Sequence, residues 1–139
     1  MSWKDVLREL GGGDVSFLTV EGEEMEFVVV DVCVPMTSKY KNVEQQRIGA
    51  PIVTLEGFSL LIMGMRLARR LGKYEKRFRE VAFKVTRVGG AGDQSAKYPV
   101  QVITDENKVK ALWTIAEAEY IPELLEQAIK DAEIIMKGR

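Results

Sequence analysis

The pattern of hydrophobic and polar residues along the first half of the chain predicts one short helix followed by strands. Residues 27–34 are dominated by β-branched side chains, as in a buried strand, and Pro35 is expected to end that strand. Residues 36–50 are polar without an apolar period, which predicts a long loop. The expected elements of this half are a helix at 2–10, strands at 14–20, 24–34 and 51–55, and the loop at 36–50.

The middle of the chain changes from a helical period to a period of two. Residues 58–72 place leucines and methionines on one helix face and arginines on the other, although the short apolar run at 58–63 also fits a continued strand. Residues 79–88 and 98–104 alternate like the two strands of a hairpin. The segment at 58–72 is therefore expected to separate two groups of strands.

The order of these elements indicates a β-rich α+β fold. One helix between the third and fourth of five strands is the element order of an OB-fold, a five-stranded Greek-key barrel. Pro122 interrupts a long helical pattern after the last strand, so we expect two C-terminal helices, at 107–118 and 122–137. The sequence thus predicts an OB-like domain over 1–106, including the short N-terminal helix, and a helical extension over 107–139 that packs on it or dimerises.

Composition excludes several kinds of chemistry. The chain has 139 residues, enough for one ordinary domain, with 46% hydrophobic and 29% charged residues, as in a globular protein. It has no histidine, which excludes histidine triads, histidine metal sites and histidine proton relays. Its single cysteine, Cys33, excludes an intrachain disulfide and is expected to pack as a small hydrophobe in a buried strand. We expect no enzyme activity, no cofactor and no metal site.

The sequence also lacks the features of an exported or membrane chain. Residues 1–13 have no basic start followed by an apolar run, so we expect no signal peptide. The longest apolar stretch, around 60–65, is far too short to cross a bilayer. A cytoplasmic location without membrane contact is the expectation.

The net charge of −1 hides an uneven distribution of charge along the chain. Residues 37–101 carry thirteen Lys and Arg against five Asp and Glu, which gives +8. Residues 1–36 carry −6 and residues 102–139 carry −3. A local basic excess of this size is expected of a protein that binds a polyanion, and chance clustering on a solvated surface is the alternative.

Aromatic residues are interleaved with the basic ones. Tyr40 lies between Lys39 and Lys41, and Tyr98 follows Lys97. Proteins that bind single strands combine a positive groove with aromatic platforms, because every base has a face on which a ring can stack. The candidate nucleic-acid-binding residues are Lys39, Tyr40, Lys41, Arg66, Arg69, Arg70, Lys73, Lys84, Arg87, Lys97 and Tyr98.

Two neighbouring features leave alternatives open. Phe78 lies between Arg77 and Arg79, but Phe78 and Phe83 also fit a hydrophobic core, which is the preferred interpretation for Phe83. The glycine-rich segment at 89–96 is followed by a strand, not a helix, so it does not match a phosphate-binding loop. We expect it to be the tip of a hairpin.

Three runs of the chain follow a familiar pattern: FVVVDVCVP, IVTLEGFSLLIMGMRLARRLGKY and FREVAFKVTRVGGAGDQSAKYPVQVI. With them, residues 24–104 resemble virus- and plasmid-type single-stranded-DNA-binding OB-fold proteins. The resemblance implies binding of single-stranded DNA across the barrel face through stacking and phosphate contacts. By position, the family's binding loop matches Lys39, Tyr40 and Lys41, and its hairpin matches Lys84, Arg87, Lys97 and Tyr98. The chain ends in a helix where the bacterial proteins have a flexible acidic tail, so a non-OB single-strand binder with dimerising C-terminal helices is kept as a second fold.

The sequence therefore predicts sequence-tolerant binding of single-stranded DNA, in replication, recombination or repair, with RNA or a duplex as other nucleic-acid ligands. The alternative is a protein-interaction module or virion structural component that acts through the C-terminal helices. A homodimer through residues 107–137 is a further expectation, because that segment is more apolar than a small barrel alone would cover.

Overall fold

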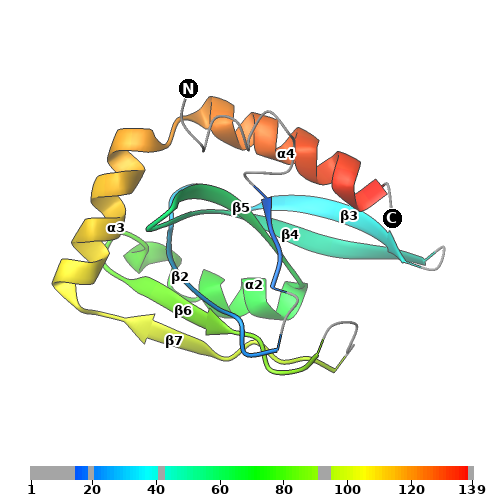
Figure 1. Ribbon diagram of the computed structural model, residues 1–139, viewed down its shortest axis with the longest axis horizontal. Coiled ribbons are helices and arrows are strands. Elements are labelled where there is room, and N and C mark those ends of the chain that lie inside the picture. Colours follow the sequence, from blue (N-terminus) through cyan, green and yellow to red (C-terminus); the bar gives the residue numbers. More distant parts are fainter. Residues whose placement is uncertain (1–14, 19–20, 41–42, 91–94, 138–139) are drawn as a thin grey trace.

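The fold was analysed in a computed structural model, which describes residues 15–18, 21–40, 43–90 and 95–137. These residues form a mixed seven-stranded sheet with helices on both faces (Figure 1). The strands are β1 Val15–Ser16, β2 Glu24–Val29, β3 Val34–Tyr40, β4 Val43–Thr54, β5 Gly57–Met63, β6 Ala82–Thr86 and β7 Val100–Ile103. The helices are α2 Met65–Gly72, the 3-10 turn η1 Glu75–Arg77, α3 Glu106–Glu119 and α4 Pro122–Lys137.

The strands follow the order β1-β5-β4-β2-β6-β7, and β3 also pairs with β4. The β1–β5 pair is parallel, and all the other pairs are antiparallel. Strands β4 and β5 are joined by a tight turn that ends at Gly57, whose positive φ of 117° favours glycine. Strand β4 of this hairpin lies inside the sheet, between β5 and β2.

A bulge interrupts the chain between β2 and β3. Val29 pairs with Ile52 and Val34 pairs with Gly49, so the four residues at 30–33 lie opposite only two residues of β4. One of those two, Pro51, has no N–H to offer, and its carbonyl accepts a 3.0 Å hydrogen bond from the Val30 N–H. Strands β2 and β3 are therefore one long strand whose pairing with β4 is broken by two extra residues.

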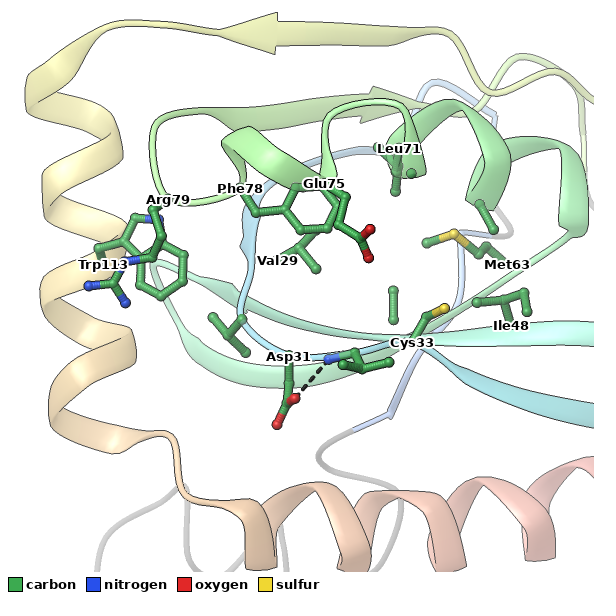
Figure 2. A pocket seen from close by; sticks show the side chains of 15 residues that line it. Val29, Asp31, Cys33, Ile48, Met63, Leu71, Glu75, Phe78, Arg79 and Trp113 are labelled. Carbon is green, nitrogen blue, oxygen red and sulfur yellow. Dashed lines mark hydrogen bonds between the residues drawn. The ribbon is translucent and has the colours of Figure 1, made fainter.

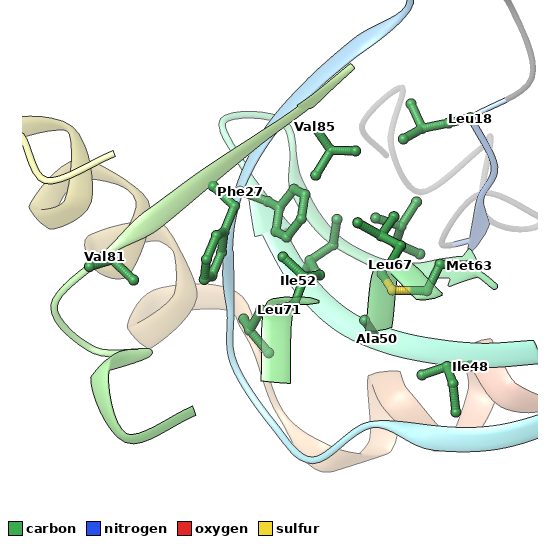
Figure 3. Packing of buried hydrophobic residues seen from close by; sticks show 13 residues of the cluster. Leu18, Phe27, Ile48, Ala50, Ile52, Met63, Leu67, Leu71, Val81 and Val85 are labelled. Carbon is green, nitrogen blue, oxygen red and sulfur yellow. The ribbon is translucent and has the colours of Figure 1, made fainter. Parts of the chain in front are cut away.

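The two faces of the sheet carry separate hydrophobic clusters. On one face, Phe27 and Ile52 pack with Leu67 and Leu71 of α2, and all four side chains are at most 5% exposed (Figure 3). On the other face, α3 and α4 cover Val53, Phe58 and Leu60 together with the rest of a second cluster. The three helices thus cover both faces of the sheet, α2 on one side and α3–α4 on the other.

Several of the predicted elements are confirmed. The C-terminal helices break at Pro122 as expected, and Val81, Phe83 and Val85 point to the core while Lys84 points away. The helix predicted over 58–72 is wrong in its first part, because α2 begins only at Met65. The apolar run at 58–63 lies in strand β5, as in the alternative interpretation, and it is buried on both faces of the sheet. The predicted helix at 2–10 lies outside the described residues.

The predicted loop at 36–50 is wrong, because most of it lies in the hairpin of β3 and β4. Its ends, Met36 and Ala50, both pair within the sheet, and the described polar residues of β3 and β4 form a ribbon that extends from it (Figure 1). Pro35 does not end the strand, since it lies within β3, opposite Ile48. An edge strand tolerates a proline whose missing N–H is turned away from the partner.

The β-rich α+β class is confirmed, but the sheet is not closed into a five-stranded barrel. Among the described residues, β7 pairs only with β6, and β5 pairs with β4 and β1. The short parallel strand β1 occupies the edge of β5 at which closure would occur.

Candidate nucleic-acid interface

Helix α2 presents four cations on its outer side. Leu67 and Leu71 anchor it, at 5% and 3% exposure, and the positions that follow the same 3.6-residue period on the opposite side are basic. These exposed residues are Arg66, Arg69, Arg70 and Lys73. The amphipathic pattern alone thus places all four predicted residues of this segment at the surface.

One hydrogen bond joins α2 to the β6–β7 hairpin. Arg70 Nη1 donates to the carbonyl oxygen of Tyr98, over a distance of 3.3 Å. Lys97, the residue before Tyr98, is exposed and pairs with Val88 across the hairpin. The structure therefore brings the predicted helix residues and the predicted residues Lys97 and Tyr98 to the same part of the molecule.

Arg87 holds the base of this hairpin and is 6% exposed. Its guanidinium donates to the carbonyl oxygens of Leu18, Gly89 and Gly90, at 3.1, 2.9 and 2.6 Å. It also donates to the Tyr98 hydroxyl and lies 5.5 Å from the centre of that ring. A guanidinium with these partners is already desolvated and occupied, so Arg87 positions the hairpin instead of facing a phosphate directly.

Lys84 lies away from α2. Its ammonium is 3.3 Å from the carboxylate of Glu24 on β2, and it shares its side of β6 with Ala82, which belongs to the cluster under α3 and α4. Lys39 and Tyr40 are the last two residues of β3, where they pair with Glu44 and Val43 of β4 at the end of the β3–β4 hairpin. Lys41 lies outside the described residues. The predicted residues are thus divided between α2 with the β6–β7 hairpin, the end of the β3–β4 hairpin, and Lys84.

A cavity of about 300 Å³ opens beside α2 and was not predicted from the sequence (Figure 2). Its apolar lining includes Val29, Ile48, Ala50, Leu71 and Phe78. The bulge at 30–33 forms one wall, because its two extra residues separate this part of the chain from β4. Register breaks of this kind leave no clear pattern in a single sequence, which is why the cavity was missed.

Cys33 lies at this bulge, and the expectation that it is buried is wrong. The thiol is exposed and lines the cavity, where Figure 2 shows it opposite Glu75. The β-branched run from 27 to 34 suggested a continuous buried strand, but only Phe27, Val28 and Val29 of its first part are buried. The bulge turns the following residues outward.

Trp113 of α3 closes another side of the cavity. The Arg79 guanidinium lies 4.3 Å from the centre of the indole ring and is 3.2 Å from Glu117 on the same helix. The indole Nε1–H is buried and has no acceptor among the described residues. Arg79 therefore connects the segment after η1 to α3.

Tyr120, in the connection between α3 and α4, is hydrogen-bonded to the bulge. Its hydroxyl donates a 2.6 Å hydrogen bond to Asp31 Oδ2, and the other oxygen of Asp31 accepts one of 2.7 Å from the Val32 N–H. Burial raises the pKa of the Tyr120 phenol, and the hydrogen bond and negative charge of Asp31 raise it further. Both carboxylate oxygens of Asp31 are thus engaged in holding the shape of the bulge.

Comparison of the chain with protein-family models, with curated proteins and with solved structures finds no match. Within the described ranges, no group of three or more metal-ligating side chains comes together. No helix of the described part of the chain has the length and apolar character needed to cross a membrane.

Proposed function

We propose that the protein binds single-stranded DNA with little sequence preference, in replication, recombination or repair. The observation that carries this proposal is the hydrogen bond from Arg70 to Tyr98, which puts the cations of α2 beside the β6–β7 hairpin. A strand that crosses this surface would meet several cations from two elements. Such a surface suits a phosphate backbone, which contributes most of the affinity of sequence-tolerant binding.

The exposed cations of α2 are available to a ligand. Among the residues that the structure describes, Arg66, Arg69 and Lys73 have no carboxylate within ion-pair distance. Surface cations without such partners are balanced by mobile counterions. A bound strand displaces its own counterions when these cations neutralise its phosphates, which makes the affinity strongly dependent on salt.

The connectivity supports an OB-like arrangement for this function. When β2 and β3 are counted as one bulged strand, the first strand pairs with the second and the fourth, the second with the third, and the fourth with the fifth. Helix α2 lies between the third and fourth strands of this count. OB-folds are partly open barrels whose loops 1–2 and 4–5 contact nucleic acid, and by chain order these correspond to the connections between β3 and β4 and between β6 and β7.

The C-terminal helices give a second candidate function less support. Their apolar residues Leu112, Ala128 and Ala132 are at most 3% exposed and belong to the cluster on the chain's own sheet. In the described part of this region, the exposed large apolar side chains are Ile121, between the two helices, and Ile134 of α4, at 52% and 71% exposure. Homodimerisation or a protein partner would therefore use a small apolar area around α4.

The proposal is tested by fluorescence anisotropy with labelled oligo-dT at low and high salt, with duplex DNA and oligo-rU as competitors. The variant R69Q/K73Q removes two cations of α2, and K110Q/K130Q removes two exposed lysines of α3 and α4 as a matched control. If each α2 cation neutralises one phosphate, the salt slope of log K falls by about 1.4 in R69Q/K73Q, at about 0.7 per contact. The control should keep the wild-type slope.

Three results would overturn this proposal. One is the absence of binding at low salt. Another is equal loss of affinity in the two double variants, which would indicate a non-specific charge effect. The third is displacement of the oligo-dT by the duplex at a lower concentration than by unlabelled oligo-dT. Stronger competition by oligo-rU would move the proposal from DNA to RNA.

A further inference from the structure

The cavity beside α2 has the size and lining of a small-molecule site. Its volume of about 300 Å³ is at the lower end of the range for such pockets. The interior is aliphatic, with the ring of Phe78 and the indole of Trp113 among its walls. A flat, largely apolar body matches such a lining, since it buries apolar area against the aliphatic side chains and a ring face against the aromatic ones.

The lining of the cavity includes Glu75, an exposed residue whose carboxylate is available to a ligand. Figure 2 shows Glu75 directed into the cavity, opposite Cys33. Within the described residues, the Glu75 carboxylate has no ion pair and no hydrogen-bonding partner. A carboxylate accepts hydrogen bonds and cannot donate them, so it favours a ligand with N–H groups on one edge. The second carboxylate of the lining, Asp31, already accepts from Val32 and Tyr120.

The segment that carries Glu75 is otherwise basic. Lys73 precedes it, and Lys76, Arg77 and Arg79 follow, all of them exposed. Arg77 and Arg79 are paired with Glu80 and Glu117, whereas Lys73 and Lys76 have no carboxylate partner in the described part of the chain. A ligand with N–H donors inside the cavity would match the Glu75 carboxylate. If the same ligand were anionic outside the cavity, it would also match the neighbouring cations. A nucleotide has this distribution.

The cavity also adjoins the proposed path of the strand. Ala68, Leu71 and Gly72 line it, whereas Arg70 turns toward the β6–β7 hairpin on another side of α2. Successive helix residues are about 100° apart around the axis, which places Lys73 on the basic side, next to the end of the cavity wall. A strand on the basic side of α2 would thus reach the cavity at the C-terminal end of the helix.

We propose that this cavity is a subsite for one unstacked guanine base of a bound strand, with Glu75 accepting from the base; the inference rests on the proposed function. Guanine presents a ring N1–H and an exocyclic amino group side by side, and the two oxygens of one carboxylate accept from both. Thymine presents a single N–H between two carbonyl oxygens, which a carboxylate repels. Adenine and cytosine offer an amino group beside a ring acceptor. The subsite adds a preference at one position, and the rest of the contact stays sequence-tolerant.

The test uses oligo-dT strands that carry one central dG, dI or dT, titrated against wild type, E75Q and E56Q. Deoxyinosine lacks only the exocyclic amino group of guanine. Glu56 is exposed in the β4–β5 turn and outside the cavity lining, so E56Q controls for the loss of one negative charge. Wild type and E56Q should bind the dG strand about 10-fold more tightly than the dT strand, with dI between them. E75Q should reduce the ratio between dG and dT to within about twofold, because its amide offers one acceptor instead of two.

Cys33 gives a readout at the site itself, because it is the single cysteine of the chain and lines the cavity. The rate of its reaction with a thiol-specific maleimide should fall in the presence of the dG strand more than in the presence of the dT strand. E75Q should remove this difference, when the rate for each protein is expressed relative to its own rate without DNA.

The two proposals fail in different ways. Equal binding of the three strands by wild type, with no difference in Cys33 protection, would overturn the guanine subsite and leave single-strand binding standing. A preference for dG that persists in E75Q would also overturn it, because the recognition would then lie elsewhere. Absence of binding by all three strands at low salt would overturn both proposals.

Discussion

The Tyr120 hydroxyl donates a 2.6 Å hydrogen bond to Asp31, which connects the corner between the C-terminal helices to the bulge of the sheet. Tyr120 also lies against the ring of Phe58, with 5.2 Å between the ring centres. The corner is thus held by one polar and one aromatic contact. Asp31 lines the cavity and Tyr120 lies 89 residues further along the chain, so this contact links the C-terminal helices to the wall of the cavity.

The variant Y120F keeps the ring contact and removes the hydrogen bond. We expect it to lower the free energy of unfolding at pH 7 by about 1 kcal/mol. Because the folded protein holds the phenol proton more tightly than the unfolded chain, ionisation favours unfolding as the pH rises past about 10. The stability advantage of wild type over Y120F should therefore shrink above that pH, as measured by urea unfolding from pH 7 to 11. A constant difference across this range would contradict the assignment.

Replacement of Arg87 should destabilise the protein more than replacement of an exposed arginine. The variant R87M leaves the carbonyl oxygens of Leu18, Gly89 and Gly90 without their donor, and we expect a loss of about 2–4 kcal/mol. R87K should lose nearly as much, because an ammonium cannot reproduce the fork of a guanidinium. The exposed R66M is the control, with a change within about 0.5 kcal/mol, and equal effects of R87M and R66M in denaturant unfolding would argue against the positioning role.

The first turn of α3 depends on a cap that can be removed without touching the core. Asp105 Oδ1 accepts hydrogen bonds from the backbone N–H groups of Asn107 and Lys108, at 2.9 and 3.3 Å. D105A should cost about 1 kcal/mol of stability, and D105N should cost much less because asparagine caps almost as well. If thermal unfolding gave the same loss for both variants, the charge of Asp105 and not its capping role would explain it.

Tyr40 is expected to act on binding and not on stability. It lies at the end of the β3–β4 hairpin, where it pairs with Val43. If it stacks on a base, Y40A should weaken oligo-dT binding by about 1–3 kcal/mol, and Y40W should retain most of the affinity. The melting temperature should change little in either variant. Unchanged affinity in Y40A, or a collapse of its stability, would remove Tyr40 from the interface.

Regular periods in the sequence predicted the parts of the fold in which packing follows the local pattern. The alternation of Val81, Phe83 and Val85 identified the inward face of β6, and Pro122 marked the break between the two C-terminal helices. The helical period of α2 also identified its basic side, because Leu67 and Leu71 are the residues it buries. These segments could be predicted because their structure requires only that the neighbouring element present an apolar surface to the buried side.

The parts that the sequence did not predict depend on partners that are distant along the chain. The polar residues of the β3–β4 ribbon pair with one another, so they show no apolar period. The bulge at 30–33 depends on the register with β4, which places Pro51 opposite it. The same bulge exposes Cys33 and opens the cavity, and neither follows from the β-branched run itself. Arg87 was predicted to contact nucleic acid because most of its acceptors are backbone carbonyl oxygens, which a sequence does not reveal.

The parallel pairing of β1 with β5 has a consequence for the order in which the chain folds. Strands β4 and β5 are separated by a tight turn, so their contacts close a small loop and form at little entropic cost. Val15 and Leu60 are far apart in sequence, and their pairing needs much of the sheet to be in place first. The β4–β5 hairpin is therefore expected to form early and to give the slowest amide exchange, whereas the edge at β1 should assemble last and open first.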